Sequence, residues 1–144
     1  MEKLISELKR TDSNIPYVEV KHNNIKFNFV VDSGCTISCI DENILDLLLH
    51  TDTGEKSEGV LFANGDESKQ TKIIEMSFEI GNKEFVEKFN AVDFYNMTKQ
   101  VKDNFGITVR GLLGSEFLYN NKLILDFDES TIKYKDNNQL ELDL

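Results

Sequence analysis

The sequence predicts one mainly β domain, built as a closed barrel or as two packed sheets. Two observations predict it: apolar and polar residues alternate in several short runs, and turn residues such as Gly and Asn separate those runs. The chain has 144 residues, close to the usual size of one domain, and no linker or long internal repeat divides it. A chain of this length can bury a core without metals or disulfides.

The first half of the chain alternates like a set of strands. Residues 17–21 and 25–31 predict two strands around a tight turn, and residues 36–40 continue as an extended run. Asp41 is a good N-cap for a short helix over residues 42–49, which a polar loop follows over residues 51–59. An apolar run before Asn64-Gly65 predicts a projecting hairpin, because Asn-Gly is a strong hairpin signal.

The second half predicts further strands and one more short helix. Residues 74–80 and 85–92 alternate around a turn, whereas residues 93–105 suggest only a loop with a helical turn. Residues 107–113 predict a strand that Gly114 closes, and Ser115 is expected to cap a short helix that ends at Tyr119. Residues 123–127 and 131–134 predict a terminal hairpin.

Residues 1–14 are polar and carry charges of both signs. We therefore expect them to form a mobile N-terminal extension, and we expect residues 15–144 to form the domain. The extension has no apolar core of signal-peptide length.

Charge excludes several classes of partner. The chain has 26 acidic and 16 basic residues, which gives a net charge of −10. Such a surface repels the phosphates of nucleic acids and anionic lipids. No run approaches the roughly 18 apolar residues of a membrane helix. We therefore expect neither a nucleic acid nor a membrane partner.

The two cysteines, Cys35 and Cys39, lie four residues apart in an extended segment, too far for an easy disulfide. Free thiols in a reducing cytoplasm are the simple interpretation, and a secreted chain that has lost its signal peptide is the alternative. Neither cysteine forms a metal-ligand spacing with His22 or His50, so we expect no metal and no cofactor.

Three features follow one another along the chain. An apolar strand ends in Val30-Val31-Asp32-Ser33-Gly34, the Asn64-Gly65 hairpin comes next, and Gly111-Leu112-Leu113-Gly114 precedes the second short helix. This order resembles the retropepsin-like aspartic peptidases, the single-lobed relatives of pepsin. Their motifs are an apolar pair before Asp-Thr/Ser-Gly and, near the C-terminus, an apolar pair before Gly. The resemblance extends from about residue 15 to residue 134.

The resemblance implies a retropepsin-like closed β-barrel or sandwich with one or two short helices, and an aspartic endopeptidase that cleaves a peptide or protein substrate. It implies that Asp32 is catalytic, that Ser33 and Gly34 form the active-site loop, and that Leu113 and Gly114 support that loop. The mid-chain hairpin would form a flap over the substrate. Its residues would be Phe62, Ala63, Asn64 and Gly65.

One carboxyl group in each chain predicts a homodimer. Two carboxylates that lie close together share one proton. One can then activate a water as a base while the other protonates the substrate carbonyl as an acid. A second motif, Asp52-Thr53-Gly54, follows the polar pair His50-Thr51 rather than a buried strand, so we expect it to be a loop turn.

Other interpretations stay open. Asp32-Ser33-Gly34 could be an ordinary turn, because all three residue types are common in turns. Cys35 stands where the family often has Ala; we expect it to pack behind the loop, although a thiol nucleophile is an alternative. For the whole chain, the main rival to a peptidase is a non-catalytic peptide-binding or dimerisation module of the same fold. A processing domain that is cut from a larger protein, or acts beside one, is a third option.

Overall fold

The computed structural model describes residues 2–57 and 70–135, and these residues form eleven strands, two α-helices and one 3-10 helix. The strands are β1 (Glu2–Glu7), β2 (Lys9–Arg10), β3 (Pro16–His22), β4 (Ile25–Val31), β5 (Cys39–Asp41), β6 (Thr51–Ser57), β7 (Thr71–Ile80), β8 (Lys83–Val92), β9 (Val109–Leu113), β10 (Leu123–Asp126) and β11 (Thr131–Lys135). The helices are η1 (Glu42–Leu47), α1 (Tyr95–Phe105) and α2 (Ser115–Asn120).

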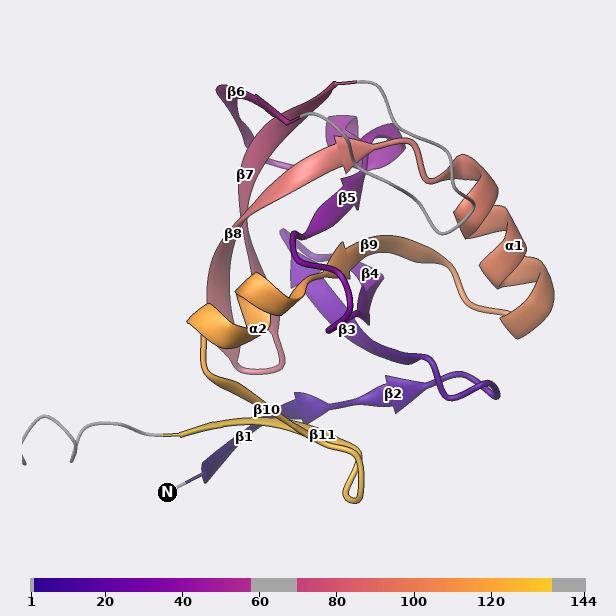
Figure 1. The fold of residues 1–144 in the computed structure, drawn as a ribbon, viewed down its shortest axis with the longest axis vertical. Coiled ribbons are helices and arrows are strands. Elements are labelled where there is room, and N and C mark those ends of the chain that lie inside the picture. Colours follow the sequence, from indigo (N-terminus) through magenta and orange to yellow (C-terminus); the bar gives the residue numbers. More distant parts are fainter. Residues whose placement is uncertain (1, 58–69, 136–144) are drawn as a thin grey trace, which may run out of the picture.

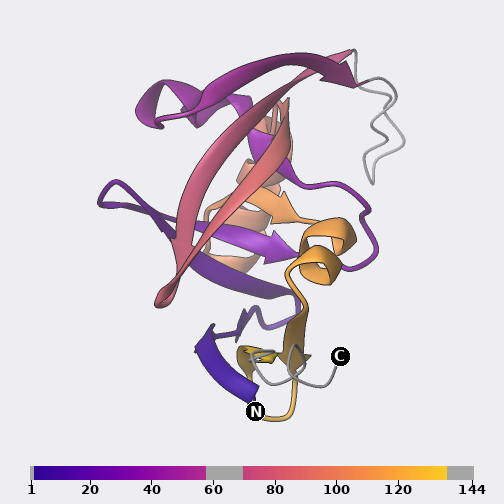
Figure 2. The same cartoon turned by 90° about the vertical axis from the view of Figure 1, so that its left-hand side faces the viewer.

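Six of the strands close into a barrel. The larger sheet has the order β2-β3-β4-β9-β5-β8-β7-β6, and a further pairing of β3 with β7 joins its two sides (Figure 1). A smaller sheet of β1, β11 and β10 lies below the barrel in both views (Figures 1 and 2). The predicted mainly β, closed-barrel fold class is confirmed.

Phenylalanine side chains fill the barrel. The ring of Phe29 on β4 lies 5.8 Å from that of Phe78 on β7 and 5.4 Å from that of Phe89 on β8, measured between centroids. Phe78 also contacts Phe117 of α2 at 5.8 Å, so this helix is anchored in the core. Each such buried side chain stabilises the fold by about 1.5–3 kcal/mol.

The structure differs from the sequence-based expectation in residues 51–57 and in residues 95–105. Residues 51–57, expected within a polar loop, form strand β6 at the edge of the sheet; both faces of β6 are largely exposed, so its sequence has no apolar alternation. Residues 95–105, expected to hold only a helical turn, form the eleven-residue helix α1, which buries no residue completely. Neither segment buries much apolar surface, so neither has the periodic spacing of apolar residues that predicts a strand or a helix.

The first short helix is a 3-10 helix over residues 42–47 rather than a helix over 42–49. Asp41 caps it as predicted, because its Oδ1 accepts a hydrogen bond from the Asn43 N–H. Among the described helices, none is long and apolar enough to cross a membrane.

Residues 2–14, which were expected to form a mobile extension, include two strands that pair with the rest of the chain. β1 pairs with β11, β2 pairs with β3, and Ile5 and Leu8 are each only 4% exposed. Gly81, in the turn between β7 and β8, lies against the backbone of Ile5 with no room for a Cβ atom. A few apolar side chains among many charges are thus enough to hold the segment on the barrel. The division of the chain at residue 14 stays a prediction.

Candidate active site

The position of Asp32 is set by the pairing of two parallel strands. β4 runs beside β9, with Val30 opposite Leu112 and Val31 opposite Leu113. The next residue, Asp32, donates its backbone N–H to the carbonyl of Leu113 at 3.0 Å. Two motifs that are far apart in the sequence therefore meet at one end of the barrel.

Asp32 begins a tight loop. Its side chain is half-buried, and its Oδ1 accepts a hydrogen bond of 3.0 Å from the Gly34 N–H, while Ser33 and Gly34 are exposed. The carbonyl of Asp32 accepts a second bond, from the Cys35 N–H at 3.1 Å. A Cβ atom at position 34 would lie 3.3 Å from Asp32 Oδ1, so glycine leaves room for the backbone to approach the carboxyl group. The bond from the Gly34 N–H orients the half-buried carboxyl group at the start of the loop.

Helix α2 begins against the same loop (Figure 1). The first N–H groups of the helix, those of Ser115 and Glu116, donate to the carbonyls of Cys35 at 2.6 Å and Thr36 at 3.1 Å. The expected capping role of Ser115 is therefore wrong: Gly114 is the N-cap, and no side chain caps the helix. Backbone carbonyls of the Asp32 loop accept the hydrogen bonds that a capping side chain would otherwise accept.

Gly114 sits where this contact is closest. A Cβ atom there would lie 2.7 Å from the carbonyl carbon of Ile37 and 2.8 Å from the carbonyl oxygen of Cys35. The Gly114 N–H donates to Ser38 Oγ at 3.0 Å. The structure thus places Leu113 and Gly114 directly behind the Asp32 loop, where the predicted supporting role requires them.

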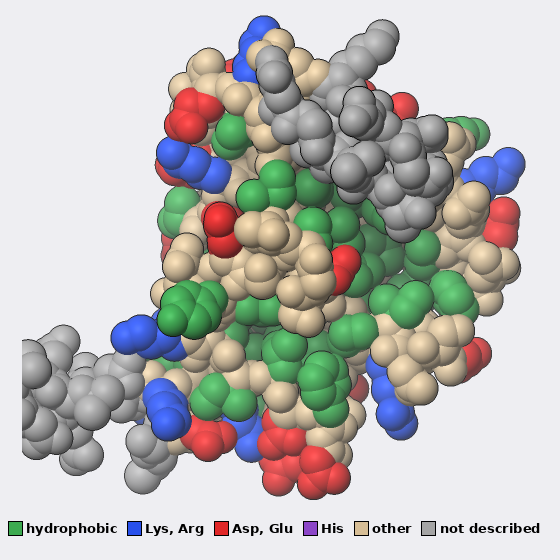
Figure 3. Space-filling view, in the orientation of Figure 1, with side chains coloured by type: hydrophobic (Ala, Val, Ile, Leu, Met, Phe, Trp, Pro, Cys, Tyr) green, Lys and Arg blue, Asp and Glu red, His purple; other side chains and the backbone are tan. Residues whose placement is uncertain are grey.

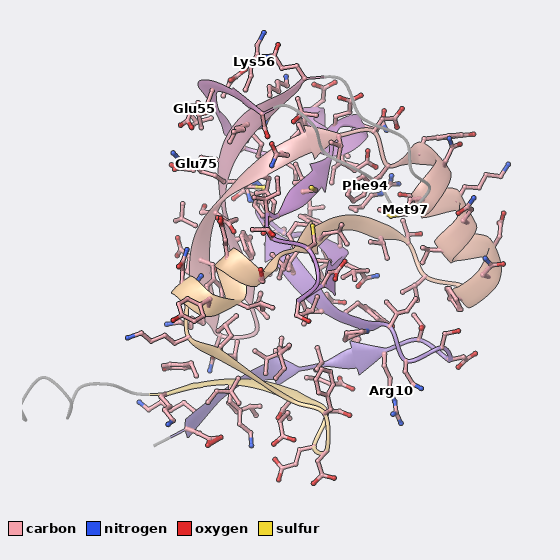
Figure 4. All side chains as sticks on the ribbon, viewed as in Figure 1. Arg10, Glu55, Lys56, Glu75, Phe94 and Met97 are labelled. Carbon is pink, nitrogen blue, oxygen red and sulfur yellow. The ribbon has the colours of Figure 1, made fainter. Side chains whose placement is uncertain are left out.

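The predicted flap residues Phe62, Ala63, Asn64 and Gly65 lie outside the described residues. In the face that Figure 3 shows, hydrophobic side chains gather across a hollowed centre. A small apolar cluster joins Phe94, Met97 and Leu112; Figure 4 labels the first two at the start of α1. Leu112 pairs with Val30, two residues before Asp32, so this cluster lies beside the strand that ends at the carboxyl group.

Sequence analysis missed a buried connection behind the loop. Ser38, only 3% exposed, donates its hydroxyl hydrogen to Glu87 Oε2 at 3.0 Å. Burial raises the pKa of Glu87 from its ordinary value of 4.5; the charge of Glu116 adds to this, and hydrogen bonds from Lys88 N–H and Ser38 oppose it. One signal could have found Glu87: it shares the inward register of Phe85 and Phe89 on β8, where a charge is unusual.

Asp41 forms a second buried connection that the sequence revealed only as a helix cap. The residue is 0% exposed, and its Oδ1 accepts hydrogen bonds from Asn43 and from the Phe94 N–H at 3.3 Å. Its Oδ2 pairs with Arg110 Nη1 at 2.9 Å. A buried carboxylate is stable only with such partners, so Asp41 joins η1, the start of α1 and β9 structurally.

The cysteines are poor nucleophiles in this environment. Burial and the charge of Asp32 raise the pKa of Cys35, and burial raises the pKa of Cys39 to about 12. Both thiols are free. The ring of His22 is held between Ser77 O and the Leu49 N–H, and His50 Nδ1 faces Leu48 O. The geometry therefore gives no support to the alternative of a Cys–His pair.

Within residues 2–57 and 70–135, no group of three or more His, Cys, Asp or Glu side chains could hold a metal.

Asp52-Thr53-Gly54 lies in edge strand β6, where the pairing register with β7 shifts between Asp52 and Lys56. The motif was expected in a loop, but it forms an exposed irregularity within a strand. Its Asp52 Oδ1 accepts the Gly54 N–H at 2.9 Å, as in the Asp32 loop, yet no buried strand precedes it.

Comparison with known proteins identifies the family. A family model described as aspartyl protease matches residues 18–117. The chain belongs to the aspartyl protease family. The chain is also similar to a retropepsin-like aspartic protease from Rickettsia conorii, at 24% identity over 93% of this chain and 91% of that one, with a TM-score of 0.56. A second similar structure is the retroviral protease-like domain of Ddi1 from Leishmania major, at 12% identity over 86% of this chain and 96% of that one, with a TM-score of 0.49. No curated protein matches.

This aspartyl protease family member has a retropepsin-like fold, as the sequence predicted. The individual roles of Asp32, Ser33, Gly34, Leu113 and Gly114 are not decided by that membership, and they stay predictions.

Replacing Gly114 with Ala tests the close contact behind the Asp32 loop. We expect Gly114→Ala to lower the free energy of unfolding by about 1–3 kcal/mol, because the added methyl group meets backbone atoms that cannot move aside. Urea denaturation measures this change. The neighbouring Ser115→Ala is the control and should stay within about 0.5 kcal/mol, since its hydroxyl caps nothing. A Gly114→Ala protein as stable as the wild type would contradict the proposed fit.

Proposed function

We propose that the protein is an aspartic endopeptidase that works as a homodimer, with Asp32 of each chain in one shared site. The observation that carries this proposal is the half-buried Asp32 carboxyl group, held at the end of β4 by the Gly34 N–H and the pairing with β9. Membership of the aspartyl protease family supports it. Residues 15–144 would form the peptidase domain.

The chemistry needs two such carboxyl groups. Side by side they would share one proton, because two negative charges at that distance repel strongly. The ionised Asp32 would take a proton from a water molecule as the water attacks the peptide carbonyl. The protonated Asp32 would donate its proton to the carbonyl oxygen. As the C–N bond breaks, the Asp32 that took the proton from water would pass it to the leaving amine, and a hydroxyl proton of the tetrahedral intermediate would return to the other Asp32. No metal, cofactor or covalent intermediate is needed in this scheme.

Further residues have proposed roles around this pair. The exposed Ser33 hydroxyl would donate to the partner chain and lock the two loops together, and Gly34 would shape each loop. Leu113 and Gly114 would support the loop from behind. The flap would pair its main chain with a bound peptide as an added strand. Its residues would be Phe62, Ala63, Asn64 and Gly65.

The two free cysteines support a reducing cytoplasm as the place where the protein works. The net charge of −10 supports the proposal that neither nucleic acid nor membrane is a partner.

The Asp32→Asn variant tests the catalytic role. We expect it to retain the fold and to lose at least about a thousandfold in the cleavage rate of denatured, fluorescein-labelled casein, because an amide cannot act as base or acid here. The matched control is Asp52→Asn, which changes the same residue type in the exposed motif of β6 and should keep the wild-type rate within about twofold. Full activity of Asp32→Asn would remove this residue from the mechanism.

The second candidate function is a non-catalytic peptide-binding module of the same fold. The charge of −10 per chain favours it, because like charges oppose the association of two copies. Light scattering across ionic strengths separates the two candidates. A peptidase dimer should become more populated between about 0.05 and 0.5 M salt, as screening weakens the repulsion. A particle that stays monomeric at every concentration and salt level would favour the non-catalytic module, or pairing with a different chain.

A further inference from the structure

Glu87 breaks the pattern of strand β8. The other inward residues around it, Phe85, Phe89 and Ala91, are buried and apolar, and Glu87 shares their register. Its pairing partner on β7, Met76, is 2% exposed. Because side chains alternate along a strand, the half-buried Glu87 side chain lies on the inward face of β8. Burial raises the pKa of Glu87, because removal from water disfavours the ionised carboxylate.

The carboxylate has specific partners there. Its Oε1 accepts the Lys88 N–H at 2.9 Å, and its Oε2 accepts the Ser38 hydroxyl at 3.0 Å. Ser38 has a single hydroxyl hydrogen, and this bond directs that hydrogen towards Glu87. The lone pairs of Ser38 Oγ are then free to accept the Gly114 N–H, which lies 3.0 Å away. A hydroxyl that donates to a carboxylate is also the better acceptor, because neighbouring hydrogen bonds polarise one another.

The same chain of contacts ends at Asp32. Leu113, next to Gly114, accepts the Asp32 N–H at 3.0 Å, and Ser115 on the other side donates to the Cys35 carbonyl at 2.6 Å. The backbone around Gly114 therefore holds both ends of the turn that carries Asp32. A contact that holds the backbone of Gly114 in place therefore also holds the turn of Asp32 in place.

From these contacts we propose that Glu87 is a positioning residue: it orients Ser38 so that Ser38 holds Gly114 and, through Gly114, the loop of Asp32. The proposal rests on the peptidase function proposed above and assigns Glu87 no contact with substrate. If the acceptor at position 87 is lost, the Ser38 hydroxyl can turn to another partner, and the Gly114 N–H is left with a weaker bond. The Asp32 loop would then sample orientations that do not suit catalysis.

A matched pair of variants isolates the acceptor. Glu87→Met keeps the volume of the side chain beside Met76 and Phe89 but removes both oxygens, whereas Glu87→Gln keeps one carbonyl oxygen for Ser38. Glu84→Met is the control, since Glu84 lies on the same strand with an exposed side chain and carries the same charge. All three are compared with the full-length wild type.

The first measurement is steady-state kinetics with a quenched-fluorescent peptide built on the casein bond that the wild type cleaves fastest. We expect Glu87→Met to lower kcat about tenfold with KM within about twofold, and Glu87→Gln and Glu84→Met to stay within about twofold of wild type in both. Normal kcat in Glu87→Met would overturn the positioning role. An equal loss in Glu87→Gln would also overturn it, since the charge and not the acceptor would then matter.

The second measurement needs no catalysis. Amide hydrogen exchange followed by NMR should show the Gly114 and Asp32 N–H groups exchanging about tenfold faster in Glu87→Met than in Glu84→Met, because local opening becomes easier. Unchanged exchange would overturn the inference even if the protein proves to be an active peptidase. Faster exchange in a protein that cleaves nothing, wild type included, would overturn the peptidase function while upholding the link from Glu87 to the loop.

Discussion

The structure depends above all on the parallel pairing of β4 with β9. Val31 lies opposite Leu113, and the first residue beyond the strand, Asp32, still donates its N–H to Leu113. A parallel pair cannot be joined by a short turn, so this contact fixes the ends of a long stretch of chain. Moving the register by one residue would turn Asp32 to the opposite face of the sheet. The position of the carboxyl group is therefore a property of the whole barrel.

The barrel makes this pairing rigid through close contacts that only small residues allow. At Gly111 of β9, a Cβ atom would collide with the ring of Phe29 and would lie 2.9 Å from the carbonyl oxygen of Cys39. Phe29 can thus fill the barrel directly beneath β9 and contact the rings of β7 and β8. The core and the Asp32 loop are in this way parts of one packing arrangement, in which Gly111 and Gly114 both allow close contacts.

The sequence predicted the strands that bury one face and the motifs that they carry. Residues 25–31 alternate and end at Asp32, and β4 has those same bounds; the hairpin of β7 and β8 was found in the same way. The exposed strand β6 and helix α1 could not be found, because neither buries a continuous apolar face. The N-terminal strands were missed for a related reason, since among residues 2–14 only Ile5 and Leu8 enter the apolar core.

The site was predicted where backbone geometry dictates residue type and was missed where side chains meet across the fold. Gly34 and Gly114 could be singled out in the sequence because glycine has no Cβ atom. At Gly34 this leaves room for the Asp32 carboxyl group, and at Gly114 for the backbone of the Asp32 loop. The bond from Ser38 to Glu87 joins the residue before β5 to strand β8, and the pairing of these strands cannot be read from the sequence, although the inward register of a charged residue is a usable signal. The ion pair of Asp41 with Arg110 likewise could not be predicted from the sequence, because it depends on how the strands pair.

We propose that one chain supplies only half of the catalytic pair. Adding Asp32→Asn chains to a fixed amount of wild-type chain tests this proposal, because mixed dimers hold one working carboxyl group. With equal amounts and random pairing, we expect the casein cleavage rate to fall to about half, and further as more variant is added. A rate that does not change on addition of Asp32→Asn chains would show that each wild-type chain cleaves without a partner's Asp32, and would overturn the shared site.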